Sequence, residues 1–230
     1  MKNILKYCAL IAVVGLVSSP AWAHRGGGGK KNDPCKKVAQ ACKESSADVH
    51  YHVCDVTDEA AVQSAASEIL SKCGAPDVLV NNAGQYAPTS FINTSLDEFK
   101  SVIDVNLTSA FLVTRAFLAD MLKKKSGDIF FICSIASLHG YADSFAYCAA
   151  KHGMLGLART LRQETINSGL RVMSIMPGAV LTPAWGDEPH DDKRFIPAAD
   201  VGKIIVDLHH LDASSDVEEL VIRPRLGDIK

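Results

Sequence analysis

The sequence predicts an α/β fold in which a mostly parallel β-sheet has helices on both of its faces. Short apolar stretches typical of buried strands alternate with longer stretches whose apolar residues recur at helical spacing. Turn and capping residues separate these stretches. The composition agrees with a folded domain, because 47% of the 230 residues are hydrophobic and 22% are charged.

The first 23 residues differ from the rest of the chain. Lysines precede an apolar run over residues 7–17, and Ala21-Trp22-Ala23 has the small-x-small pattern of a cleavage site. This order is typical of a secretory signal peptide, and the run is too short to span a bilayer. The alternative is that residues 9–17 form a buried parallel strand, since such strands are also continuously apolar.

Residues 24–35 are rich in glycine and lysine and predict a flexible linker. Four consecutive glycines also raise the possibility of a phosphate-binding loop. Such a loop needs glycines spaced through a strand-to-helix turn, however, and no clear strand precedes these. We therefore expect a single folded domain over residues 36–230.

Helices and strands alternate throughout this domain. Thr57 is a candidate N-cap, Ser95-Leu96-Asp97-Glu98 is a capping box, and Pro177-Gly178 closes a strand. The expected helices cover 36–44, 58–73, 95–126, 144–167 and 199–211. The expected strands cover 48–53, 77–80, 128–133, 170–176 and 219–223. This alternation predicts βαβ units with right-handed crossovers.

Tyr147 and Lys151 are four residues apart on an expected helix and therefore share one face. A phenol has a pKa of about 10, and a neighbouring ammonium group favours the phenolate and lowers that pKa. Tyr147 is therefore a candidate general acid/base. Taken alone the pair is weak evidence for catalysis, because a tyrosine and a lysine at this spacing are also common on helix surfaces.

Two further residues have positions suited to chemistry. Ser134 follows the strand 128–133, at the carboxyl edge where open α/β sheets bind ligands, and its hydroxyl could steady an oxyanion. Ser137 is a competing candidate. Asn106 lies in the middle of a long expected helix, where asparagine is unfavourable. A local break that holds a water would explain it, and an exposed asparagine is the alternative.

Together with Asn81-Asn82-Ala83-Gly84 and the segment from Pro177 to Thr182, these residues resemble the short-chain dehydrogenase/reductase family in order and spacing. The resemblance covers residues 36–230. It implies a Rossmann-like, doubly wound parallel sheet and hydride transfer between a small carbonyl compound and an alcohol. It also implies a nicotinamide cofactor, NADP(H) rather than NAD(H), and a cytoplasmic location. Family members pair the helices 95–122 and 144–167 across a two-fold axis, which implies a homodimer or homotetramer.

The resemblance assigns roles by position. Tyr147 is the proton donor or acceptor, Lys151 lowers its pKa and holds the nicotinamide ribose, and Ser134 orients the substrate oxygen. Asn106 holds a water in the proton relay. Besides Tyr147 and Lys151, cofactor contacts are implied for Asp55, Asn82, Ala83, Gly84, Pro177, Gly178, Val180 and Thr182.

The C-terminal third is most similar to bacterial sepiapterin reductase-like members of this family. The similar segments are 127–132, 182–186, 221–224 and 227–229. In the variable loop after Thr182, Trp185 and Asp187 are candidates for holding a polar heterocycle. Loop packing and a solvent-facing charge are the alternatives.

The N-terminal βαβ unit is incomplete compared with this family. The family opens with a strand, a Gly-rich turn (TGxxxGxG) that seats the cofactor pyrophosphate on a helix N-terminus, a helix and a second strand. Here that space holds the signal-like segment and the glycine run. An export fusion, a degenerate paralogue and a frameshift each explain this. The alternative function is thus an exported or truncated relative with impaired cofactor binding and no activity.

Other functions are disfavoured. A net charge of −2 and 7% aromatic residues give no basis for nucleic-acid binding. His50, His52 and Cys54 alternate and could ligate a metal, but half-buried positions on a strand explain them more simply, so we expect no metal site. Cys148 is not spaced from a histidine base by a known pattern and is interpreted as packing.

Overall fold

The computed structural model describes residues 11–14, 50, 52–182, 185 and 191–227. Its described main sheet is parallel, and the strand order is β1-β2-β3-β4-β7. These strands are β1 (Ile11–Val14), β2 (Val78–Asn81), β3 (Gly127–Ile132), β4 (Leu170–Pro177) and β7 (Glu219–Ile222). A small parallel pair joins β5 (Val180–Leu181) to β6 (Ile196–Pro197). The predicted parallel sheet is confirmed.

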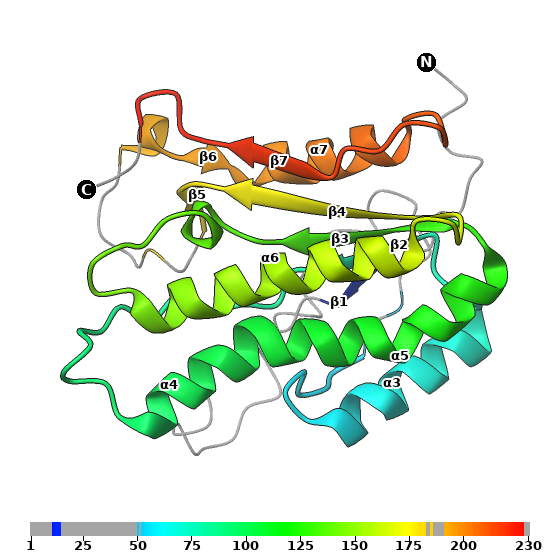
Figure 1. Cartoon of the computed structure of the whole chain (residues 1–230), viewed down its shortest axis with the longest axis horizontal. Coiled ribbons are helices and arrows are strands. Elements are labelled where there is room, and N and C mark those ends of the chain that lie inside the picture. The colour runs from blue at the N-terminus through cyan, green and yellow to red at the C-terminus, as the bar shows by residue number, and fades with distance from the viewer. Residues whose placement is uncertain (1–10, 15–49, 51, 183–184, 186–190, 228–230) are drawn as a thin grey trace.

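Helices cover both faces of this sheet (Figure 1). They are α3 (Glu59–Cys73), α4 (Leu96–Ile103), α5 (Ser109–Lys124), α6 (Phe145–Thr165) and α7 (Ala198–His209). One hydrophobic core fills the space between the sheet and α3, α5 and α6, and it includes Phe117, Phe131 and Met154. A smaller core, around Phe130 and Ile175, joins the opposite face of the sheet to α7.

The sheet includes part of the apolar N-terminal stretch. Ile11 to Val14 pair in parallel with Val78 to Asn81 as strand β1. A parallel strand is the arrangement expected from the alternative interpretation of this stretch. The rest of the signal-like segment, the glycine run and the helix expected over 36–44 lie outside the described residues.

The strand expected over 48–53 does not form where the structure describes it. His52 and Val53 lie outside any strand, and Val53 is 68% exposed. A strand needs a hydrogen-bonded neighbour, and the described sheet ends at β1. The next helix, α3, is capped by Asp58, whose carboxylate accepts the backbone N–H groups of Ala60 and Ala61, rather than by Thr57 as predicted.

The capping box at the start of α4 is present, with Ser95 and Glu98 bonded to each other's backbone N–H groups. The long helix that follows is interrupted by a π-helical turn over Asp104–Thr108, with Asn106 inside it. The local break predicted at Asn106 is therefore confirmed. The helix ends at Lys124, because Lys125 adopts the left-handed conformation at φ 58°.

The continuous helical stretch Leu96–Lys124 is the one described helix that is long and apolar enough to cross a membrane. Half of its most apolar window, 50%, is buried inside the protein. A core helix of an α/β protein passes the same test, so this feature gives little support to a membrane span.

Candidate active site

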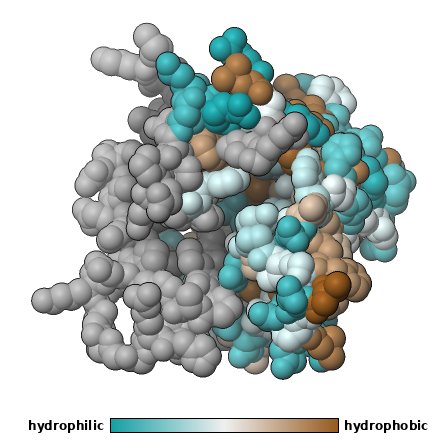
Figure 2. Space-filling model, turned by 90° about the vertical axis from the view of Figure 1, so that its left-hand side faces the viewer, coloured by the Kyte–Doolittle hydropathy of each residue, from teal (hydrophilic) through white to brown (hydrophobic). Residues whose placement is uncertain are grey.

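The candidate site lies where β2, β3 and β4 end at the same edge of the sheet. Figure 2 looks onto this edge, where the described surface is a mosaic of hydrophobic and hydrophilic side chains. Ser134 follows β3 and caps the 3₁₀ turn Ile135–Ser137, so its hydroxyl accepts the N–H of Ala136 at 3.1 Å. Tyr147 and Lys151 come from the first two turns of α6.

Ser134 and Tyr147 are in direct contact, because the Ser134 side chain hydrogen-bonds to the Tyr147 phenol. Ser137, the competing candidate, is buried and turned to other partners. Its Oγ accepts the backbone N–H of Ser134 at 3.3 Å and also bonds the Cys133 thiol. The structure therefore places Ser134, and not Ser137, beside the phenol.

Asn106 and Lys151 meet on either side of Gly84. The π-helical turn directs the fully buried Asn106 amide at the backbone of Gln85, to which it donates at 2.9 Å and from which it accepts at 3.2 Å. A Cβ atom on Gly84 would lie 2.8 Å from Asn106 Oδ1 and 3.5 Å from Lys151 Nζ. Only glycine leaves this space open between the two side chains.

Lys151 is 4% exposed, and its Nζ donates to the carbonyl of Ile132 at 2.9 Å. Nζ lies 5.7 Å from the centre of the Tyr147 ring. Burial disfavours the charged form and lowers the pKa of Lys151 to about 8. Among the described residues no carboxylate forms an ion pair with this ammonium.

The lysine does not lower the pKa of the tyrosine as predicted. Burial raises the pKa of Tyr147 to about 12, and the hydrogen bond from Ser134 offsets this only in part. The prediction was wrong because it considered the charge of Lys151 without its burial. The charge of Lys151, 5.7 Å from the centre of the ring, does not offset the burial of the phenol. In the protein without ligands, Tyr147 is therefore protonated at neutral pH.

The residues present fit the nicotinamide end of a dinucleotide. The space kept open by Gly84 borders Lys151. Of its three N–H donors, one bonds the carbonyl of Ile132 and one contacts the sulfur of Met154, which leaves one for a ribose hydroxyl. A small cleft lies close to this space and is lined by Asn81, Ala83 and residues of α5. Asn82 is exposed next to this cleft.

The remaining predicted cofactor residues lie on loops and at strand ends along the sheet. Asp55 is exposed, and its Oδ1 accepts the N–H and the hydroxyl of Thr57 at 2.9 and 2.7 Å. Pro177 ends β4, and the N–H of Gly178 donates to Ile222 at 2.8 Å. The described interactions bring none of these residues into contact with Tyr147.

The loop after β5 holds the predicted substrate residue Trp185. Its indole N–H donates to the carbonyl of Val180 at 2.9 Å, its backbone N–H donates to Thr182, and its ring packs on Phe195. The side chain is 38% exposed. Trp185 thus has the loop-packing role that the sequence left open as an alternative, and it keeps an accessible surface. Asp187 lies outside the described residues.

Sequence reasoning missed Tyr86. Its ring meets the Tyr147 ring edge to face, with 5.3 Å between centroids, and its hydroxyl lies 3.0 Å from Ser144 Oγ. Its place two residues after Gly84 was the available signal. The candidate metal ligand His52 lies instead with its Nδ1 3.4 Å from Glu68. Cys148 is buried, as interpreted from the sequence.

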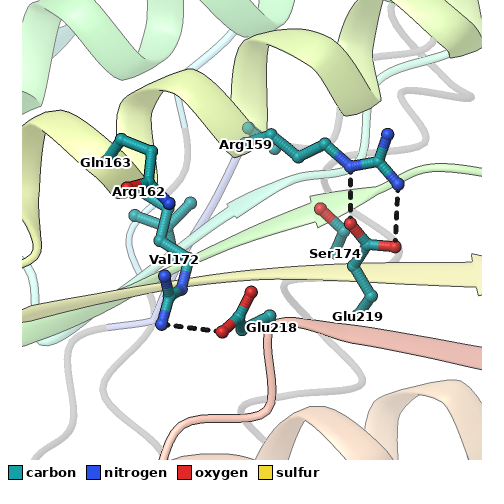
Figure 3. Close-up of a pocket in the computed structure, with 8 residues that line it drawn as sticks. Arg159, Arg162, Gln163, Val172, Ser174, Glu218 and Glu219 are labelled. Atoms are coloured by element: carbon teal, nitrogen blue, oxygen red, sulfur yellow. Dashed lines mark hydrogen bonds and ion pairs between the residues drawn. The ribbon is translucent and has the colours of Figure 1, made fainter.

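A separate hollow of about 280 Å³, including space open to solvent, lies between α6, β4 and β7 (Figure 3). Arg159 holds Glu219 through two hydrogen bonds of 2.6 and 3.1 Å, and Arg162 lies 2.9 Å from Glu218. These charges neutralise one another, and the predicted site residues do not line the hollow. It is therefore not the candidate active site.

A doubly wound parallel sheet with serine, tyrosine and lysine at its carboxyl edge defines an oxidoreductase of the short-chain type. Comparison with known families agrees, because residues 27–193 match the family described as short chain dehydrogenase. The chain belongs to this family of oxidoreductases. The sepiapterin reductase of Chlorobaculum tepidum is 32% identical over 197 residues, which cover 85% of this chain and 80% of that protein. Other curated members match over 153 residues, or 56% to 60% of their length.

Solved structures show the same fold. An alcohol dehydrogenase from the archaeon Thermococcus sibiricus, complexed with 5-hydroxy-NADP, superposes with a TM-score of 0.78 and 25% identity. The match covers 85% of this chain and 83% of that one. A metagenomic short-chain oxidoreductase in complex with NADP superposes with a TM-score of 0.71 and 28% identity, over 82% and 80% of the two chains.

Proposed function

We propose that this chain is an NADPH-dependent carbonyl reductase in which Tyr147 gives the proton to the substrate oxygen. The observation that carries this proposal is the hydrogen bond between Ser134 and Tyr147, with the buried Lys151 ammonium 5.7 Å from the tyrosine ring. Two hydroxyl groups in contact at the sheet edge suit a single carbonyl oxygen, which accepts a hydrogen bond from each.

The protonated state of Tyr147 suits its proposed role as a proton donor. At a pKa of about 12 the phenol keeps its proton at neutral pH, so it acts as a general acid toward the oxyanion that forms from a carbonyl. Ser134 donates a hydrogen bond to the same oxygen and orients it. Lys151, held by the carbonyl of Ile132, stabilises the phenolate left after proton transfer.

Lys151, Gly84 and Ala83 would hold the nicotinamide and its ribose, with Val180 and Thr182 along the neighbouring loop. The cofactor supplies a hydride to the carbonyl carbon when it is bound. NADP is the ligand named in both related structures, which supports NADPH over NADH. Because the sequence lacks the family's spaced Gly-rich turn, we expect dissociation constants in the high micromolar range or weaker.

A bicyclic, sepiapterin-like carbonyl compound is the substrate that we propose to test first, because a sepiapterin reductase is among the relatives. Trp185 and Asp187 are the side chains proposed to hold it. We also propose a homodimer or homotetramer and a cytoplasmic location. The pairing of Ile11 to Val14 within the sheet supports the latter, since a cleaved signal peptide would remove this strand.

The test is the oxidation of NADPH, followed at 340 nm, with sepiapterin and with simple ketones as substrates. Fluorescence titration with NADPH and NADH gives the two dissociation constants. We expect substrate-dependent turnover that is lost in Tyr147→Phe. If the protein bound neither cofactor and reduced no carbonyl compound, this function would be contradicted. The alternative, a truncated or exported relative without activity, would then be favoured.

A further inference from the structure

We propose that Tyr86 is a specificity-determining residue, which forms an aromatic wall beside Tyr147 and favours planar, uncharged carbonyl substrates. This inference rests on the proposed reductase function and adds a substrate class to it. Tyr86 lies on the loop after β2, whereas Tyr147 lies on α6, so the contact joins two segments that are far apart in the sequence.

The position of Tyr86 is fixed at both ends of its side chain. The ring packs edge to face on Tyr147 at 5.3 Å between centroids, and the hydroxyl is 3.0 Å from Ser144 Oγ. Ser144 is buried and precedes the first residue of α6. The loop is tied to the same place through its backbone, because the N–H of Thr89 donates to the carbonyl of Asp143 at 2.9 Å.

Although it is held in this way, Tyr86 is 49% exposed. Part of this residue therefore remains accessible, next to the tyrosine whose phenol we propose as the proton donor. A flat, conjugated group on the carbonyl carbon can stack on an open aromatic face, while a puckered group of similar size makes poorer contact. Aromatic pairs of this kind contribute roughly 0.5–1.5 kcal/mol beyond area burial, which is about a two- to tenfold preference.

The neighbouring loops suit the same substrate class. Leu138 and Tyr141, on the connection from β3 to α6, are each 37% exposed. The sequence has no lysine or arginine in residues 82–95 or 134–144. Long phosphorylated carriers such as acyl-CoA are bound through cationic side chains, and these two loops offer none. An uncharged, planar carbonyl compound fits this rim better.

The experiment compares acetophenone with cyclohexyl methyl ketone, which have the same carbon skeleton and differ in whether the ring is flat. The ratio of their kcat/KM values is measured for the wild type, Tyr86→Phe and Tyr86→Leu. Phenylalanine keeps the wall and loses the hydroxyl, whereas leucine removes the wall. We expect Tyr86→Phe to keep the ratio within twofold and Tyr86→Leu to lower it by two- to tenfold.

Ser144→Ala is the matched control, because it removes the same hydrogen bond as Tyr86→Phe and leaves the ring. It should keep the ratio too. An unchanged ratio in Tyr86→Leu, or equal losses in the leucine and phenylalanine variants, would overturn the inference. The ratio of the two dissociation constants, from ligand-observed NMR competition, needs no turnover. If neither ketone is reduced, the binding ratio still decides the role of Tyr86, while cofactor binding and the turnover of other carbonyl compounds decide the proposed function.

Discussion

A charged side chain is buried at each edge of the sheet, but only the one at the amino edge has an opposite charge beside it. At the carboxyl edge, Lys151 is 4% exposed and bonds a carbonyl and a thioether sulfur. At the amino edge, Asp128 is 2% exposed. It accepts two hydrogen bonds from Arg171, at 2.7 and 2.8 Å, and lies 2.6 Å from His209 Nδ1.

This difference indicates a structural role for the amino edge and a functional role for the carboxyl edge. The Asp128 cluster satisfies its charges and also joins three elements, because Arg171 donates to the carbonyl of His209 at the end of α7 and to that of Ser215 beyond it. Lys151 is left with a lowered pKa and unused hydrogen-bonding capacity. A buried charge without an opposite charge beside it is unfavourable for folding, so its retention at the ligand-binding edge indicates a functional role.

The largest expected effect is on catalysis, at the carboxyl edge. Tyr147→Phe removes the proton donor and should lower kcat by about 10²–10⁴-fold. Its free energy of unfolding should change little, because the ring and its contact with Tyr86 remain. Steady-state kinetics and urea unfolding measure the two quantities. Near-normal turnover in this variant would remove Tyr147 from the mechanism.

The next effect is on stability, at the amino edge. Asp128→Asn breaks a buried ion pair and leaves Arg171 without its carboxylate, which should lower the free energy of unfolding by about 3–5 kcal/mol. The KM for the carbonyl substrate should be unchanged, since the cluster lies at the opposite end of the strands. Urea unfolding tests this, and a double variant with Arg171→Met as well should recover part of the loss. If Asp128→Asn changed KM and left the free energy of unfolding unchanged, the structural role of this cluster would be contradicted.

A third prediction uses the pKa of Lys151. Burial lowers this pKa to about 8, from 10.5 for an exposed lysine, so the unfolded chain binds more protons than the folded one between these pH values. Stability should therefore rise with pH through this window, and the full penalty of about 3 kcal/mol applies below pH 8. Lys151→Met should abolish activity. Its free energy of unfolding should be higher than that of the wild type by up to this amount at pH 7, and should no longer rise with pH. Urea unfolding at pH 7 and pH 9.5 checks this, and a less stable methionine variant would contradict it.

The sequence was sufficient for features that depend on neighbouring residues. The apolar runs predicted β2, β3 and β4, and the Ser95–Glu98 capping box predicted the start of α4. Asn106, which is unfavourable inside a helix, predicted the helix break. These features are local, so their signals are contiguous. The family resemblance likewise predicted that Ser134 and Tyr147 share one site, and their side chains interact in the structure.

What the sequence could not give depends on burial and on distant contacts. The pKa of Tyr147 rises because the site is buried, and spacing along a helix does not reveal burial. Tyr86 reaches Ser144 across 58 residues. The prediction of a strand over 48–53 was wrong at His52 and Val53, because periodicity does not show whether a neighbouring strand is available for pairing.

The smallest expected effect concerns the space between the two functional side chains. Gly84→Ala places a methyl group 2.8 Å from Asn106 Oδ1, closer than carbon and oxygen pack, so the Asn106 amide must move from the backbone of Gln85. Overpacking of this kind costs about 1–3 kcal/mol. Because Lys151 Nζ is 3.5 Å from the same methyl position, affinity for NADPH should fall together with stability. Gly156→Ala is the control, since its Cβ would meet nothing within 4 Å on the same helix as Lys151, and it should stabilise the protein. Thermal unfolding and NADPH titration of both variants measure the effect. If Gly84→Ala bound NADPH as tightly as the wild type, the cofactor would not approach the sheet at Gly84.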